Sequence, residues 1–247
     1  MVKAVPRAFE HTFFRDDLLV PLHAHYQAHT STILIRITDF LAAKYTTVGT
    51  LLGLAPTHHI IMENLLIGKS SSNSKWETYD LKPTSYFFPE RDIADGRLTS
   101  QETKSKLADK FNDKIVLTRP KADAFLTQLK TDTALLSANN AVDYSLFLVR
   151  IANDSNAPSS PTEPPFAPPS PPTWRTGIKS QDGKYIFRAA ILDFFWAKHK
   201  TQAKMMTWLI KAWNLIDRQG PMSITTTPDE YRERFLKMCQ DMIEVKD

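Results

Sequence analysis

The fold is decided by two stretches, Asp143-Tyr144-Ser145-Leu146-Phe147-Leu148-Val149-Arg150-Ile151 and Lys184-Tyr185-Ile186-Phe187-Arg188-Ala189-Ala190-Ile191-Leu192-Asp193. Both are rich in aromatic and branched residues, which suit a half-buried pleated surface. If they pair as an antiparallel hairpin, the start of one strand lies beside the end of the other. The carboxylates of Asp143 and Asp193 would then meet at one end, and the long connection would project from the opposite end.

Two acidic groups that converge from distant parts of the sequence are what a phosphoryl-transfer site requires. One carboxylate orients or deprotonates the attacking hydroxyl, and the other holds a magnesium ion. The alternative is that each aspartate merely ends a strand in water. The spacing alone leaves both interpretations open.

The composition limits the classes of protein to consider. The chain has 247 residues, of which 42% are hydrophobic and 11% aromatic, so it can bury a core in one large domain or two small ones. The net charge of +4 favours anionic partners without naming one. A single cysteine, Cys239, excludes an internal disulfide framework and fits a reducing compartment. No apolar run has membrane-spanning length, so we expect any membrane contact to be peripheral.

Periodicity and turn residues predict the remaining elements. Strands are expected at 1–5, 32–41, 58–62 and 76–82. Helices are expected at 7–26, with a kink or split at Pro21, from Pro120 to Leu136, and from Pro228, where Thr227 and Glu230 form a capping box. Residues 90–113 are expected to form a solvated loop, and the Pro/Ser-rich residues 154–172 a mobile insertion within the hairpin.

Two further groups of residues are candidates for a site. In the strand at 76–82, Asp80 and Lys82 share one face opposite Leu81, either as a functional pair or as a surface ion pair. His25 and His29 are four residues apart and could bind zinc from one helix face, but a third ligand at motif spacing is missing.

The ordered set of motifs resembles that of the phosphatidylinositol phosphate kinases. Val142–Leu148 is similar to their Met-Asp-Tyr-Ser-Leu-Leu-Leu catalytic segment, Tyr79–Lys82 to their Asp-Leu-Lys-Gly-Ser motif, and Ile191–Asp193 to Ile-Ile-Asp. Residues 59–65 resemble the segment that links the two lobes beside the adenine, and residues 228–235 resemble the Pro-x-x-Tyr-x-x-Arg-Phe signature. Within the family, Gln219–Met222 suggests the kinases that phosphorylate phosphatidylinositol 3-phosphate at the 5 position.

The resemblance implies a fold and a set of roles. The fold would be α+β, two-lobed and kinase-like (the SAICAR synthase/PIP kinase-like fold), with residues 1–247 as one catalytic domain that lacks most of the N-terminal lobe sheet. The cofactors would be ATP and Mg²⁺. The partners would be a phosphoinositide headgroup and the surface of a membrane, but no nucleic acid. The protein would be cytoplasmic and peripheral to membranes. The oligomeric state stays open. The implied roles are catalysis by Asp143, metal binding by Asp193, ATP binding by Lys3, Met62, Asn64, Leu65 and Lys82, and lipid binding by Lys198, Lys200 and Lys204.

Three departures from the family pattern support alternatives. The sequence begins at the strand of Lys3, without the Gly-rich strands that would cover the ATP phosphates; Pro83 replaces a glycine; and Gln202-Ala203-Lys204 stands where paired lysines are expected. The chain could therefore be a catalytically weak or inactive kinase-like module that binds anionic lipid or a protein partner. It could also be part of a longer chain that is active only with the missing lobe.

Overall fold

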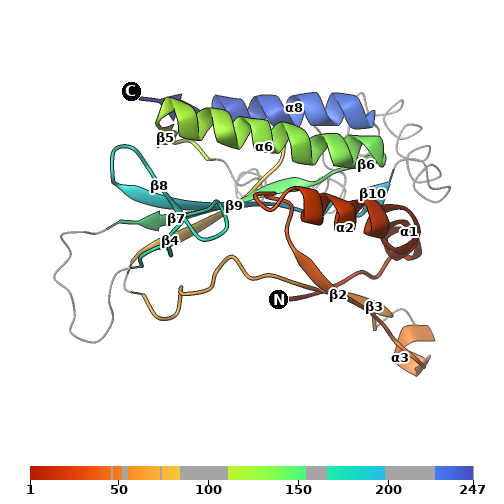
Figure 1. Ribbon diagram of the computed structural model, residues 1–247. Helices are drawn as coiled ribbons and strands as arrows, with labels where there is room; N and C mark the ends of the chain where they lie inside the picture. Colours follow the sequence, from red (N-terminus) through yellow and green to blue (C-terminus); the bar gives the residue numbers. More distant parts are fainter. Residues whose placement is uncertain are drawn as a thin grey trace, which may run out of the picture.

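The computed structural model describes residues 1–45, 47–51, 55–72, 74–83, 111–153, 166–197 and 226–246. Within these residues, the chain forms helices and the strands of several separate sheets (Figure 1). This mixture confirms the predicted α+β class. The largest sheet has four strands in the order β4-β7-β9-β8, and a second sheet has three strands in the order β1-β3-β2. The candidate site lies where these two sheets meet.

The four-stranded sheet contains the predicted hairpin. Its strands are β4 (Trp76–Leu81), β7 (Ser145–Ala152), β8 (Ile178–Lys179) and β9 (Tyr185–Leu192). β7 and β9 pair antiparallel, with Ser145 opposite Leu192 and Ala152 opposite Tyr185. Four apolar side chains of β7 are fully buried and each contributes about 1.5–3 kcal/mol of hydrophobic stabilisation, namely Leu146, Leu148, Val149 and Ile151. The hairpin prediction is therefore confirmed.

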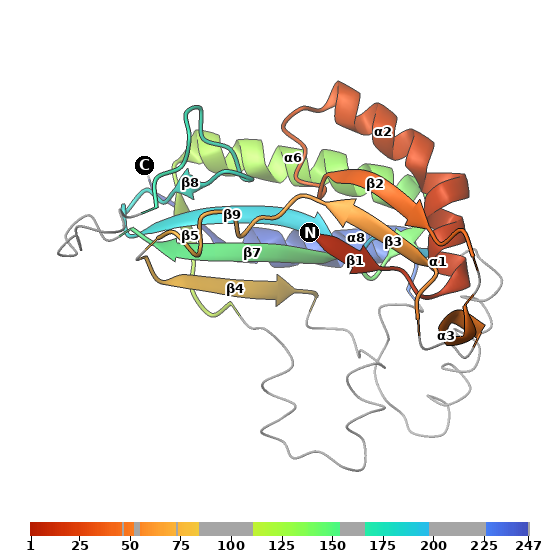
Figure 2. The same ribbon diagram turned by 90° about the horizontal axis from the view of Figure 1, so that it is seen from below.

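Two long helices cover one face of this sheet. Figures 1 and 2 show α6 (Arg119–Ala138) and α8 (Pro228–Asp241) side by side against it. Each has proline in its first turn, and the Thr227 side chain caps α8 by accepting a hydrogen bond from the Glu230 N–H. The second half of the predicted capping box differs, because the Glu230 carboxylate pairs with Arg234. Two short strands, β5 (Ile115–Leu117) and β11 (Ile243–Val245), pair in parallel beside the helices.

The three-stranded sheet carries the beginning of the chain. It consists of β1 (Val2–Ala4), β2 (Ile37–Ala42) and β3 (His58–Met62), with the short helix α3 (Val48–Leu51) between the last two. The predicted helix at 7–26 is split into α1 (Ala8–Phe13), a π-helical turn (Phe14–Leu18) and α2 (Leu19–Ala28). The split lies just before Pro21, which has no N–H to donate to the preceding turn.

The strand prediction for 32–41 was wrong in its first half. Only Ile37–Ala42 forms a strand, whereas Ile33, Leu34 and Ile35 are all buried in succession. A strand with one solvated face would bury alternate residues, so this burial does not fit the period of two that the prediction assumed. The segment instead runs beside the end of β9, where Ile35 N–H bonds to the carbonyl of Ile191 (3.0 Å).

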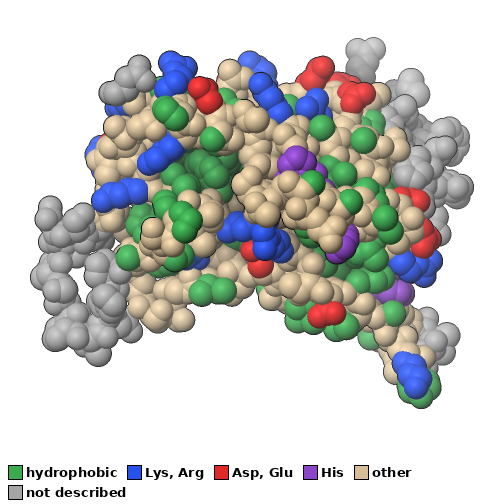
Figure 3. Space-filling view, in the orientation of Figure 1, with side chains coloured by type: hydrophobic (Ala, Val, Ile, Leu, Met, Phe, Trp, Pro, Cys, Tyr) green, Lys and Arg blue, Asp and Glu red, His purple; other side chains and the backbone are tan. Residues whose placement is uncertain are grey.

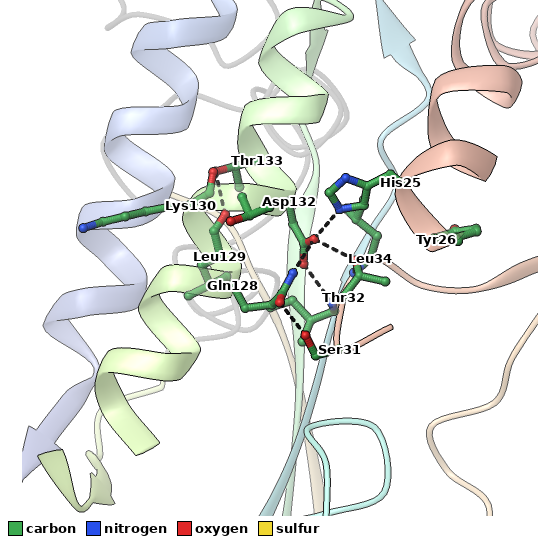
Figure 4. A network of polar contacts seen from close by, with 12 residues as sticks. His25, Tyr26, Ser31, Thr32, Leu34, Gln128, Leu129, Lys130, Asp132 and Thr133 are labelled. Atoms are coloured by element: carbon green, nitrogen blue, oxygen red, sulfur yellow. Dashed lines mark hydrogen bonds and ion pairs between the residues drawn. The ribbon is translucent and has the colours of Figure 1, made fainter. Parts of the chain in front are cut away.

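A buried polar network holds this segment against α6 (Figure 4). Asp132, which is 0% exposed, accepts hydrogen bonds from His25 Nε2 (2.7 Å), Thr32 Oγ1 (2.7 Å), the Ile33 N–H (2.8 Å) and Gln128 Nε2 (2.9 Å). The four donors offset the cost of burying a carboxylate. The sequence held a signal for this network, since Asp132 lies on the otherwise apolar stripe of α6.

Parts of several predictions lie outside the described residues: residues 90–110 of the loop expected at 90–113, residues 154–165 of the insertion expected at 154–172, and what was expected between 198 and 225. Within the described part of the insertion, Phe166 packs edge-on against Trp76, with ring centroids 5.2 Å apart. Figure 3 shows basic and acidic side chains interspersed over the face it displays. None of the described helices combines the length and the apolar character needed to cross a bilayer.

Candidate active site

Asp143 and Asp193 occupy equivalent turns at one end of the four-stranded sheet. Asp143 lies between β6 (Ala141–Val142) and β7, and Asp193 lies between β9 and β10 (Trp196–Ala197). β6 and β10 pair with each other, just as β7 and β9 do, so the two turns are held side by side. Both aspartates have φ of 64°, a left-handed conformation that aspartate tolerates better than most side chains. Such backbone strain is often found at functional sites.

The turn at Asp143 is supported from α8. The Tyr231 hydroxyl donates a hydrogen bond to the carbonyl of Tyr144, and the two rings pack edge-on with centroids 4.7 Å apart. The Phe235 ring also packs edge-on against Tyr144, with centroids 4.9 Å apart. The terminal helix therefore fixes the backbone next to Asp143, which explains why aromatic residues recur along its buried face.

Lys82 lies directly after β4 and reaches the first aspartate. Its Nζ is 3.0 Å from Asp143 Oδ2, and each side chain is only 11% exposed. The register of β4 on β7 places Leu81 opposite Leu146, which brings Lys82 to the same end of the sheet as Asp143. An ion pair this sheltered is screened much less by solvent than a surface pair.

Lys3 reaches the second aspartate from the other sheet. It lies on β1, and its ammonium group forms an ion pair with Asp193 Oδ1. Both side chains are partly exposed, so this pair can open at lower cost than the pair of Lys82. The Lys3–Asp193 contact joins the three-stranded sheet to the end of the four-stranded sheet.

These four side chains line a common cavity of about 260 Å³, together with six further residues, Ala4, Val5, Arg7, Glu10, Phe195 and Trp196. The geometric condition set by the sequence, that the two carboxylates and a facing lysine converge, is therefore met. The cavity holds three basic and three acidic side chains, so it can bind both a polyanion and a cation.

Arg7 and Glu10 are the charged residues of this cavity that the sequence analysis missed. The Arg7 guanidinium lies 5.5 Å from the centre of the Trp196 ring, and its Nη1 is 3.2 Å from Glu10 Oε1. Burial raises the pKa of Glu10, while the positive charges of Arg7 and Lys3 oppose this shift. A usable signal was the short connection after the strand of Lys3, because only three residues separate β1 from α1 and the start of the helix must therefore stay near the end of the strand.

The other predicted residues are placed differently. Met62 and Leu65 are buried in the core, and Asn64 turns its side-chain oxygen onto the Leu66 N–H (3.0 Å). None of these three is among the residues that line the described cavity. The lysines at 198, 200 and 204 lie outside the described residues.

The possible zinc site gains no support. His25 is buried and bonded to Asp132, and its ring centroid is 4.5 Å from that of His29. In the described part of the chain, no group of three or more His, Cys, Asp or Glu side chains could hold a metal ion. A metal at the cavity would therefore need oxygen ligands from a bound molecule as well as from the protein, as Mg²⁺ commonly has.

Two comparisons with known proteins bear on the identity of the chain. A family model described as Phosphatidylinositol-4-phosphate 5-Kinase matches residues 1–171 and 151–242. A search of curated proteins gave no match.

Proposed function

Because the chain belongs to the phosphatidylinositol phosphate kinase family, we propose that it transfers the γ-phosphate of ATP to an inositol-ring hydroxyl of a phosphoinositide. The observation that carries the proposal is the shared cavity of Lys3, Lys82, Asp143 and Asp193. Phosphoryl transfer needs little covalent chemistry from a protein, but it needs positioned charges around the phosphate. We take the three-stranded sheet and the four-stranded sheet as the centres of two kinase-like lobes.

We assign each of the four side chains a role. Asp143 orients the attacking hydroxyl and accepts its proton. Lys82 stays within reach of Asp143 and binds a phosphate oxygen, and Lys3 binds the nucleotide phosphates from the opposite sheet. Asp193 is a suitable magnesium ligand, since it is a partly exposed carboxylate at the cavity wall, and a bound Mg²⁺ would neutralise charge that develops on the phosphate oxygens. Lys3 must leave Asp193 when a cation binds there.

The identity of the lipid substrate is proposed from fewer residues than the phosphate transfer itself. Phosphatidylinositol 3-phosphate, with transfer to the 5 position, rests on residues 219–222, which lie outside the described part of the chain. The lysines at 198, 200 and 204 are proposed to bind the anionic headgroup at a membrane surface. Vesicle binding that does not weaken when all three become alanine would contradict that assignment.

A second candidate is a module that binds nucleotide or anionic lipid with little or no turnover. It is favoured by Pro83, which is buried directly after Lys82 and offers no N–H to a phosphate. It is also favoured by the ion pairs of the cavity, since Lys3 and Lys82 must both exchange a carboxylate for a phosphate before they can act.

A radiolabelled phosphate-transfer assay on phosphoinositide vesicles separates the two candidates. The test variant is Asp143→Asn, because asparagine also tolerates φ of 64° and so preserves the turn. We expect turnover to fall by about 10²–10⁴-fold, the usual contribution of a positioned proton acceptor. Asp39→Asn, on the exposed side of β2, is the matched control and should leave turnover unchanged.

Thermal denaturation with Mg-ATP tests the nucleotide site without turnover. At 100 times the dissociation constant, a bound ligand adds about 2.7 kcal/mol of stability, which raises Tm by roughly 5–10 °C in a chain of this size. The shift should disappear in Lys82→Ala. A normal Mg-ATP shift without any phosphate transfer would favour the second candidate, and absence of both would refute the proposed activity.

A further inference from the structure

Besides the short connection from β1 to α1, the chain crosses twice between the three-stranded sheet and the rest of the molecule. The first crossing, residues 29–36, leads from α2 to β2, and the second starts at residue 63, after β3, and leads to β4. They contact each other directly: the Glu63 N–H donates to the carbonyl of Arg36 (3.0 Å), and the Arg36 N–H donates to Glu63 Oε1 (2.9 Å). Contacts that hold these crossings therefore help to fix how the two sheets lie relative to each other.

Arg188, on β9, holds the second crossing. Its Nη1 donates to the carbonyls of Leu65 and Ile67, the latter at 2.8 Å. The side chain is buried, with the residue 5% exposed, and its guanidinium lies 4.4 Å from the ring centre of Phe166 and 5.1 Å from that of Trp76. Desolvation lowers the pKa of Arg188, so the carbonyls and rings compensate for a real cost of burial.

Arg175 holds the first crossing and links it to the second. Its Nη2 donates to the carbonyls of Thr32 and Leu34, both at 2.6 Å, and its Nη1 forms an ion pair with Glu63. Burial, and then the nearby charge of Arg36, lower the pKa of Arg175 to about 10, so it remains charged at neutral pH. One guanidinium therefore contacts both crossings.

The two arginines are connected to each other and to the cavity. Arg188 Nε donates to the carbonyl of Thr176 (3.1 Å), the residue after Arg175. Arg188 also lies on β9, five residues before Asp193, which directly follows that strand, while Lys3 belongs to the sheet at the far end of the crossings. We propose that Arg175 and Arg188 are positioning residues that fix the sheet bearing Lys3 relative to Asp193, and so set the spacing of the phosphate-binding groups.

The expected effect on the phosphate-binding groups rests on the proposed function, whereas the contacts of the two arginines with the crossings do not. A buried charge is a poor way to gain stability alone, because an apolar side chain of similar volume often does as well or better. A planar guanidinium that spans several backbone carbonyls does fix the geometry of segments that lie outside the regular strands. Replacing either arginine should therefore change the positions of the side chains at the cavity more than it changes the free energy of unfolding.

The first experiment compares Arg188→Met and Arg188→Lys with wild type. Arg150→Met is the matched control, because Arg150 lies on the neighbouring strand β7 and pairs with Glu77 and Asp113 instead of the crossings. Without nucleotide, hydrogen exchange at residues 63–67 should become about tenfold faster or more in Arg188→Met. Arg188→Lys should recover part of the protection, and Arg150→Met should exchange at these residues like wild type. Unchanged exchange in Arg188→Met would overturn the proposal.

The second experiment asks whether the effect reaches the cavity. In Arg188→Met, kcat/KM for ATP should fall by about 10–100-fold, as expected for misplaced binding groups, while KM for the lipid stays within twofold of wild type. The loss should be smaller when Lys3 is already alanine, because both changes act on the same contact. Full additivity of the two changes, or a loss of stability with normal kinetics for ATP, would refute the positioning role.

Two provisions keep the outcomes separate. If Arg188→Met does not fold, Glu63→Gln can replace it, because this variant removes the ion pair of Arg175 with Glu63, whose side chain is 25% exposed. The same changes in exchange and kinetics are then expected, but smaller. If wild-type protein binds no Mg-ATP and transfers no phosphate, the proposed function fails. The exchange rates at residues 63–67 then still decide whether the two arginines hold the crossings.

Discussion

Replacing Asp132 by asparagine should destabilise the protein by about 2–4 kcal/mol. Four donors converge on the two carboxylate oxygens, three of them on Oδ1 and the Ile33 N–H on Oδ2 (Figure 4). The amide nitrogen of asparagine must replace one oxygen, and the less costly position is that of Oδ2. The Ile33 N–H then faces another donor and loses its partner, which costs about 1–3 kcal/mol in a buried site. The three remaining bonds lose the strengthening that a charged acceptor provides.

Thermal denaturation monitored by circular dichroism measures this change. For a chain of this length, a loss of about 3 kcal/mol corresponds to a fall in Tm of roughly 6–12 °C. Asp123→Asn is the matched control, since it makes the same chemical change at an exposed position of the same helix and should stay within about 0.5 kcal/mol of wild type. If Asp132→Asn were as stable as Asp123→Asn, the interpretation of Asp132 as a pure acceptor would be wrong.

Three further predictions follow from single residues. Thr227→Ala removes the side-chain acceptor of the Glu230 N–H at the start of α8 and should cost about 1 kcal/mol, measured by the same denaturation. The Lys75 side chain, followed by Arg150, lowers the pKa of Glu77 from 4.5 to about 2. The ionised Glu77 carboxylate therefore contributes its full stabilisation above pH 4.5, and this stabilisation is lost as the pH falls toward 2. Glu77→Gln should therefore flatten the decline of the free energy of unfolding with pH in that window. Burial raises the pKa of the fully buried Cys239 thiol, so a thiol reagent should label it only after unfolding, and rapid labelling of native protein would show that α8 opens.

Local patterns in the sequence were sufficient for many of the elements. The branched and aromatic composition of the two central segments predicted strands, and their pairing followed because one face of each had to be buried. The starts of α6 and α8 were marked by an Arg-Pro and a Thr-Pro step, which act within a few residues and so need no tertiary context. The convergence of Asp143 with Asp193 was predictable for the same reason, since an antiparallel hairpin fixes which ends meet.

The segment at 32–36 shows where local pattern failed. Its apolar residues suggested a strand, yet they are buried one after another because Asp132 of α6 and Arg175 enclose the chain from sites about 100 and 140 residues away. Periodicity in a short window carries no information about such distant partners.

What the sequence by itself determined was the strands that lead to Lys3, Lys82 and the two aspartates, and the end of the hairpin at which its carboxylates lie. What only the tertiary structure decided was the partner of each charge: Lys3 with Asp193, Arg7 with Glu10, and the two buried arginines with backbone carbonyls. The physical reason is range. Helix and strand preferences arise from neighbours along the chain, whereas an ion pair or a clamped carbonyl requires two segments whose approach depends on how the whole core packs.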